Sequence, residues 1–193
     1  MTSARVGLLA GLAVWAAAST LGPVSAHAQA QKGVISDKTV LTLMDFAWAL
    51  TPGEYTTESG KVVRINKDKF DEVKLPVDDA REVIRVARLS GQAQLCEMPE
   101  AQTANYETLM EREVARAKWT DQQLVFINKL HLFTVMTLTG QVKAVETDKA
   151  TRPQEPPGKP AVTCTEADRK RIEEQVLAYV KTAPTAPADP KKK

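Results

Sequence analysis

The spacing of apolar residues along the chain is mainly helical. Apolar side chains recur at intervals of three and four residues in five stretches, which is the pattern of helices with one buried face. These predicted helices cover about residues 37–50, 78–96, 99–117, 120–138 and 165–182. The sequence therefore predicts an all-α fold, an irregular bundle of about five helices in a single domain.

Residues that cap or stop helices support three of these boundaries. Ser36 or Asp37 can cap the first helix, and Pro52-Gly53 stops it. The Asp78-Asp79 pair supplies a cap and negative charge for the second helix, and Pro99 suits the first turn of the third. In the third helix the predicted buried stripe consists of Tyr106, Met110, Val114 and Ala117.

The fourth predicted helix has the most specific start and the most apolar body. Thr120 and Gln123 have the spacing of a capping box, while Trp119 and Leu124 occupy the positions of a hydrophobic staple. From residue 124 to 138 apolar side chains lie on nearly all sides, which indicates a central helix. Its interspersed polar residues argue against a membrane span.

The remaining segments are shorter or irregular. Residues 54–65 contain β-favouring runs around Ser59-Gly60 and predict a short β-hairpin or an extended loop. The proline-rich stretch from Thr147 to Pro160 predicts a loop. The last helix opens with a Thr165-x-x-Asp168 capping box, and its predicted inner stripe is Ile172, Val176 and Tyr179.

The first thirty residues have the pattern of a signal peptide. Arg5 precedes an apolar run, and small residues around positions 26–30 fit cleavage after residue 28 or 30. We therefore expect a signal peptide at 1–30, a helical domain at 31–182 and a disordered Pro/Ala/Lys tail at 183–193, in a periplasmic or secreted protein. An uncleaved anchor is the alternative, because the stretch before residue 31 carries no charge after Arg5. After cleavage no stable membrane insertion is expected.

The predicted export would place the two cysteines in an oxidising compartment, where disulfides form and persist. Cys96 and Cys164 are predicted to pair and to close a loop of roughly 69 residues, worth about 4 kcal/mol in the chain-entropy model. The alternative is two free thiols. Neither cysteine belongs to a Cys-x-x-Cys motif, which disfavours redox catalysis and haem attachment.

Charge excludes one class of function. The chain has 26 Lys and Arg against 24 Asp and Glu, so it lacks the basic excess of a nucleic-acid-binding protein. The sequence also predicts no cofactor and no metal. One histidine beyond the cleavage region cannot make an ordinary zinc site, and neither phosphate-binding glycine loops nor EF-hand spacing occurs.

His131 is the candidate residue for catalysis. It lies on an apolar helical face, where a general base could sit, but a core histidine with a satisfied hydrogen bond is the competing interpretation. Ser90, Asp121 and Cys96 are available as partners, although none lies in a triad motif.

Two surfaces are candidates for binding. Arg81, Arg85 and Arg88 form a predicted basic ridge that could dock an acidic protein surface or anionic envelope material. The alternative is a solvated face with local pairing to Glu82. The second candidate is an apolar groove for a small ligand or a partner helix, with core packing as the alternative. Its predicted lining is Trp48, Trp119, Phe126 and Met136.

One stretch of the chain resembles a known group of proteins. The residues from Leu95-Cys96 through Trp119-Thr120-Asp121-Gln122-Gln123-Leu124-Val125-Phe126-Ile127 to Leu130-His131 resemble small, uncharacterised exported helical proteins of bacteria. The resemblance implies an all-helical exported fold. It implies no activity, cofactor or catalytic residue.

Three hypotheses of function follow from these patterns. The leading one is a non-enzymatic envelope protein that binds another macromolecule, such as another envelope protein. The second is a carrier of a small apolar ligand, and the third is a small hydrolase or transferase that uses His131.

Overall fold

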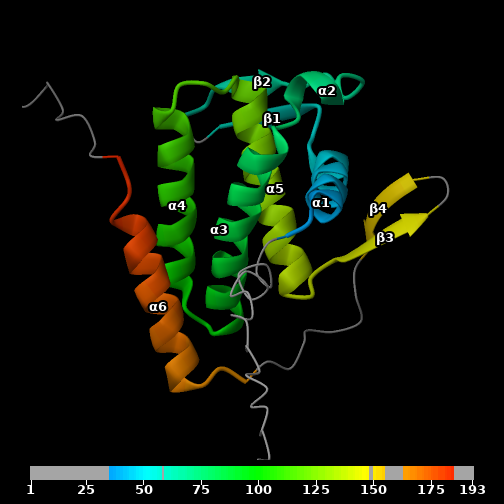
Figure 1. Cartoon of the computed structure of the whole chain (residues 1–193). Coiled ribbons are helices and arrows are strands. Elements are labelled where there is room, and N and C mark those ends of the chain that lie inside the picture. Colours follow the sequence, from blue (N-terminus) through cyan, green and yellow to red (C-terminus); the bar gives the residue numbers. More distant parts are fainter. Residues whose placement is uncertain (1–34, 58, 148–149, 155–162, 185–193) are drawn as a thin grey trace, which may run out of the picture. The chain divides into compact units, whose positions relative to one another are not determined.

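The computed structural model describes residues 35–57, 59–147, 150–154 and 163–184. For the described residues between 143 and 154, it describes the backbone alone. The described chain contains six helices and two antiparallel hairpins (Figure 1). The helices are α1 (Asp37–Leu50), α2 (Phe70–Val73), α3 (Val77–Leu95), α4 (Pro99–Ala115), α5 (Asp121–Leu138) and α6 (Glu166–Val180). The strands are β1 (Glu54–Thr56), β2 (Val62–Arg64), β3 (Lys143–Thr147) and β4 (Ala150–Gln154). The predicted helical bundle and the short hairpin near 54–65 are confirmed.

Two predicted segments lie outside the described residues. The signal peptide at 1–30 falls there, as does the predicted tail from residue 185 onward. The described residues all belong to one compact unit, which begins at Ile35. None of the helices in the described ranges is both long and apolar enough to span a membrane.

Helix α1 is capped at both ends by side chains. At its start, Ser36 Oγ accepts a hydrogen bond from the Thr39 amide at 3.2 Å, as predicted. At its end, the Lys67 ammonium donates to the carbonyls of Trp48 and Thr51 and lies 4.0 Å from the centre of the Trp48 ring. A cation at a helix C-terminus meets the negative end of the dipole, so Lys67 fixes the loop before α2 against α1. Helix α2 is a single turn of four residues, too short for its periodicity to be recognised in the sequence.

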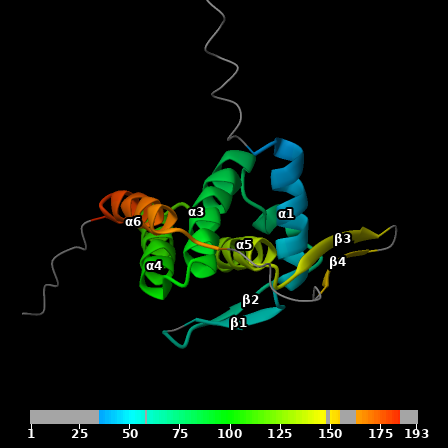
Figure 2. The same cartoon turned by 90° about the horizontal axis from the view of Figure 1, so that it is seen from below.

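Helix α5 is the centre of the bundle. Eight of its residues are buried, and it packs against α1, α3 and α4 (Figure 2). The predicted capping box is present, because Thr120 Oγ1 accepts from the Gln123 amide and Gln123 Oε1 accepts from the Thr120 amide. The main core gathers around this helix, with Phe46 of α1 stacked on Phe133 at a centroid distance of 5.4 Å. The prediction of a central fourth helix is confirmed.

Helix α3 approaches α5 closely through a glycine. A Cβ atom placed on Gly91 would lie 3.1 Å from Leu138 Cδ1, which is tighter than most contacts of real Cβ atoms. The predicted cap of α3 is corrected in detail. Pro76 holds the N-cap position without a side-chain hydrogen bond, and Asp78 and Asp79 lie in the first turn, where their charge still faces the positive end of the helix dipole.

The predicted buried stripe of α4 is only partly right. Met110 packs against the main core and Tyr106 is partly buried, but Val114 is 57% exposed and Ala117 lies beyond the helix. The buried residues are Asn105, Thr108, Leu109 and Glu113. Three of these four are polar, so a search for apolar periodicity could not find the inward face of this helix.

The disulfide between Cys96 and Cys164 is confirmed. Its Cα atoms are 5.3 Å apart, and it joins the end of α3 to the segment that enters α6. The Thr165 capping box is present, and the predicted inner stripe of α6 is buried. The residues around this junction form a small second core, called here the α6 seam, which consists of Ala93, Cys96, Ile172 and Val176.

The predicted loop from Thr147 to Pro160 is wrong over its first part. Strands β3 and β4 pair antiparallel, with Ala144 opposite Pro153. Proline lacks one backbone donor, but a two-stranded ribbon consists only of edge strands, where a missing donor can be tolerated. Residues 155–162, the rest of the predicted loop, lie outside the described residues.

The corrected stripe of α4 can be tested with two truncations. Leu109→Ala is expected to lower the free energy of unfolding by about 3 kcal/mol, because the Leu109 side chain is fully buried and its loss leaves a cavity. Val114→Ala, the control from the same helix, is expected to change it by less than about 0.5 kcal/mol. Urea unfolding followed by circular dichroism measures both. Equal losses would restore the original stripe.

Candidate functional site

Arg81, the first residue of the predicted ridge, holds two helices together. Its guanidinium donates to the carboxylates of Asp37 and Asp78 and, at 3.1 Å, to the Ile35 carbonyl. The Arg81 side chain is 24% exposed. These contacts join the start of α3 to the start of α1, so the charge of Arg81 is already neutralised within the fold.

The other two ridge residues differ from each other. Arg85 forms a two-pronged pair with Glu82, at 2.8 Å from Nε and 2.6 Å from Nη2. Arg88 is exposed and forms no ion pair with a described residue. The three side chains therefore do not present a row of free cations, although their role in binding stays a prediction.

His131 belongs to a buried polar cluster that joins three helices. Its Nε2 lies 3.0 Å from Ser90 Oγ of α3, and Asn105 Nδ2 of α4 donates to the same oxygen at 2.8 Å. Asn105 also donates to the Val86 carbonyl at 2.9 Å. With Asn105 donating to Ser90, the hydroxyl proton is free to point at Nε2 of a neutral imidazole. We call this the Ser90–Asn105–His131 cluster.

The chemistry of this cluster is limited by burial. A serine beside a histidine is the pairing of an activated nucleophile, but Ser90 and Asn105 are fully buried and His131 is 5% exposed. Burial also lowers the pKa of His131 to about 4, which makes the imidazole a weak base. The other two suggested partners are engaged elsewhere: Asp121 pairs with Lys61 at 2.6 Å, and Cys96 is in the disulfide. The geometry favours the core interpretation of His131.

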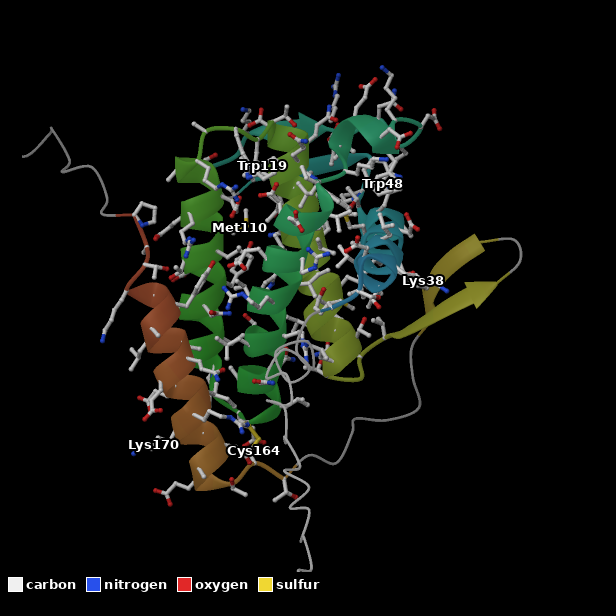
Figure 3. All side chains as sticks on the ribbon, in the orientation of Figure 1. Lys38, Trp48, Met110, Trp119, Cys164 and Lys170 are labelled. Atoms are coloured by element: carbon white, nitrogen blue, oxygen red, sulfur yellow. A yellow bond between two sulfur atoms is a disulfide. The ribbon has the colours of Figure 1, made fainter. Side chains whose placement is uncertain are left out.

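The aromatic residues proposed to line an apolar groove contribute to the main core. Phe126 is fully buried, and Trp48, Trp119 and Met136 are partly buried against the same cluster. Trp48 stacks on Phe70 of α2 at 5.0 Å and meets Phe126 edge-on at 6.0 Å. Figure 3 places Trp48 and Trp119 near the end of the bundle where α5 begins.

A further candidate site is a charged cleft beside α4. It has a volume of about 480 Å³ and is lined by α3, α4 and the C-terminal end of α6 with the residues that follow. The lining residues are Glu82, Arg112, Glu113, Ala115, Arg116, Tyr179, Thr182 and Pro184. We call this the Arg112 cleft.

The cations of the cleft have different partners. Arg116 is bound by carboxylates, at 2.9 Å from Asp79 and 3.1 Å from Glu113. Glu113 is 5% exposed and also accepts a hydrogen bond from Trp119 Nε1 at 2.5 Å. Arg116, Glu113 and their partners thus form a closed ionic network.

Arg112 has only neutral partners among the described residues. Its Nη1 donates to Thr182 Oγ1 at 2.6 Å, and its guanidinium carbon lies 5.0 Å from the centre of the Tyr179 ring. It forms no ion pair with a described carboxylate. The side chain is thus held in place by a hydroxyl and an aromatic face while its charge stays available to an outside group.

The pKa shifts in the cleft reflect the charges of nearby arginines and the burial of its side chains. The hydrogen bond from Arg85 lowers the pKa of Glu82, and the charges of Arg112 and Arg116 act in the same direction. Burial raises the pKa of Tyr179 to about 12, so the phenol remains a neutral hydroxyl at physiological pH. Glu82 therefore stays ionised, and the cleft combines fixed charges with an uncharged phenol.

The described residues bring together no set of three or more His, Cys, Asp or Glu side chains that could hold a metal ion. The inward position of Tyr179 was predicted from the sequence, whereas the role of Arg112 was not. On sequence alone, Arg112 is one of many charged residues on a helix, and only the packing of α6 against α4 gives it neutral neighbours.

Comparisons with known proteins add no relative. No family model, curated protein or solved structure matches this chain.

The burial of His131 predicts a dependence of stability on pH. Its pKa is about 4 in the folded chain and 6.5 in an unfolded one, so between these values only the unfolded chain binds the proton. The free energy of unfolding is expected to be highest above pH 6.5 and to fall by about 3 kcal/mol as the pH drops to 4. Urea unfolding at a series of pH values measures it.

His131→Gln is the matched variant, because an amide can keep the hydrogen bond to Ser90 without titrating. This variant is expected to show a much flatter curve between pH 6.5 and 4. The only other histidine of the sequence, His27, lies outside the described residues. If wild type and variant lost stability in parallel, His131 would not be the titrating group.

Proposed function

We propose that this chain is an exported, non-enzymatic interaction module that binds an acidic segment of another protein in the Arg112 cleft. The observation that carries the proposal is the guanidinium of Arg112, which lines the cleft and has only neutral partners among the described residues. A carboxylate of the partner would complete its pairing.

The rest of the cleft supports a protein ligand. Its volume of about 480 Å³ lies within the range of pockets that hold ligands, and its lining combines fixed charges with a phenol. Tyrosine and arginine are the side chains most often enriched where proteins bind one another. Arg116 and Glu113 satisfy each other, so they can shape the rim without competing for the ligand's charge.

Export is part of the proposal. It is supported by the signal-peptide pattern of the first thirty residues and agrees with the disulfide, since such bonds persist in the periplasm or outside the cell. A periplasmic or secreted location would also place the module among the envelope proteins that the sequence analysis named as partners.

The two other hypotheses have less support. A carrier of small apolar ligands would need an apolar cavity, and the aromatic residues suggested for one are packed into the main core. A hydrolase or transferase that uses His131 would need access to Ser90 Oγ, and that side chain is fully buried. Both would require helices to move apart before a ligand could enter.

The proposal predicts charge-selective binding that depends on Arg112. A fluorescein-labelled hexaglutamate peptide is expected to bind, and Arg112→Gln is expected to weaken its binding about tenfold, the loss of one charged hydrogen bond. Fluorescence anisotropy at low and high salt measures both, and added salt should weaken binding.

Two controls make this test specific. Lys38→Gln removes the same charge from the exposed side of α1, which does not line the cleft, and is expected to change affinity less than about twofold. A hexaglutamine peptide should bind far more weakly than hexaglutamate. The proposal is wrong if hexaglutamate does not bind, or if Arg112→Gln and Lys38→Gln have the same effect.

A further inference from the structure

Helix α6 is attached to the bundle more sparingly than the other long helices. It packs against α4 and α3, at the edge of the bundle seen in Figure 1. Three of its fifteen residues are buried, compared with eight of eighteen in α5. A helix of this length is marginally stable by itself in water, so it depends on its attachments.

The attachments are of three kinds. At the N-terminal end the Cys96–Cys164 disulfide ties the chain to α3, at the position where Figure 3 labels Cys164. Along its length, Ile172 and Val176 pack in the α6 seam against small residues such as Ala93. At the C-terminal end, Tyr179 and Thr182 meet Arg112. The disulfide is the single covalent attachment among them.

The Arg112 cleft depends on these attachments. Tyr179, Thr182 and Pro184 provide its α6 side, and they supply both described partners of Arg112. If α6 left α4, Arg112 would lose its hydrogen bond and its aromatic neighbour together. The cleft therefore exists only while α6 is docked.

A small pocket leads to the disulfide from outside. Its volume is about 190 Å³, and both Cys96 and Cys164 line it, together with Leu95, Thr163 and Arg171. Cys96 is 3% exposed, whereas Cys164 is partly exposed. An attacking thiolate would therefore reach the sulfur of Cys164 first.

We propose that the Cys96–Cys164 disulfide is a redox switch for the Arg112 cleft, opened by a dithiol reductant that reaches the disulfide through this pocket. One thiolate of the dithiol attacks Cys164 Sγ, forms a mixed disulfide and releases Cys96 as a thiolate. The second thiol of the partner then attacks the mixed disulfide and releases Cys164. The dithiol is oxidised by two electrons, both cysteines become thiols, and α6 undocks from an otherwise folded bundle.

The conformational part of the proposal is tested by hydrogen exchange, which needs no ligand. The full chain is compared in its oxidised form and after treatment with dithiothreitol, as is the Cys96→Ser/Cys164→Ser variant. In the reduced protein and in the variant, amides of α6 are expected to exchange at least tenfold faster, while buried amides of α5 change less than twofold. Unchanged exchange in α6, or equal acceleration in α5, would overturn it.

The chemical part is tested by brief exposure of the oxidised protein to reduced glutathione, followed by alkylation and peptide mass spectrometry. The first adduct is expected on Cys164, with Cys96 alkylated. First adducts on Cys96, or a native disulfide that dithiothreitol leaves intact, would refute the proposed route.

The functional consequence rests on the proposed binding function and is measured separately. Reduction is expected to weaken hexaglutamate binding about tenfold, as loss of the Arg112 site should. If hexaglutamate fails to bind even the oxidised chain, the proposed function fails while the exchange result stands. If it binds both forms equally although α6 is released, the switch is refuted and the binding function is not.

Discussion

The burial of α5 is the constraint on which the other helices depend. Its sequence is apolar on nearly every side, and its eight buried residues must be covered by other helices to keep water out. Helices α1, α3 and α4 provide that cover, and Gly91 lets α3 come close enough to close one side. The buried contacts of His131 with Ser90, and of Ser90 with Asn105, fit the same arrangement, because these hydrogen bonds fix α3, α4 and α5 against one another inside the core.

Helix α6 lies mostly outside this arrangement, and the proposed function concerns the boundary between the two. It covers α4 and the end of α3 through a narrow seam of small and branched side chains, and Tyr179 is its one buried contribution to the main core. A lightly attached element can separate without loss of the main core, which is why both proposals place binding and its control at α6. The disulfide acts there mainly by limiting where an undocked α6 could go.

Several of the arginine and lysine charges are already used within the fold. Arg81 and Lys67 are used to fix helix ends, and Arg85 and Arg116 are paired with carboxylates. Arg112 differs because its neighbours across the cleft, Tyr179 and Thr182, are neutral. A row of arginines on one helix was therefore a poor guide to the available charge, since ion pairing depends on neighbours from other helices.

The sequence by itself determined those features whose cause is local. Capping boxes at Thr120 and Thr165, the stop after Leu50 and the central character of α5 follow from residues within a few positions of one another. The pairing of the two cysteines was predicted from their number together with the signal-peptide pattern. Only the tertiary structure decided the inward face of α4, the strand that includes Pro153 and the contacts of Arg112 with Thr182 and Tyr179. In each case the deciding partner lies on another element: α3 for Asn105, β3 for Pro153 and α6 for Arg112. Periodicity within one segment carries no information about such a partner.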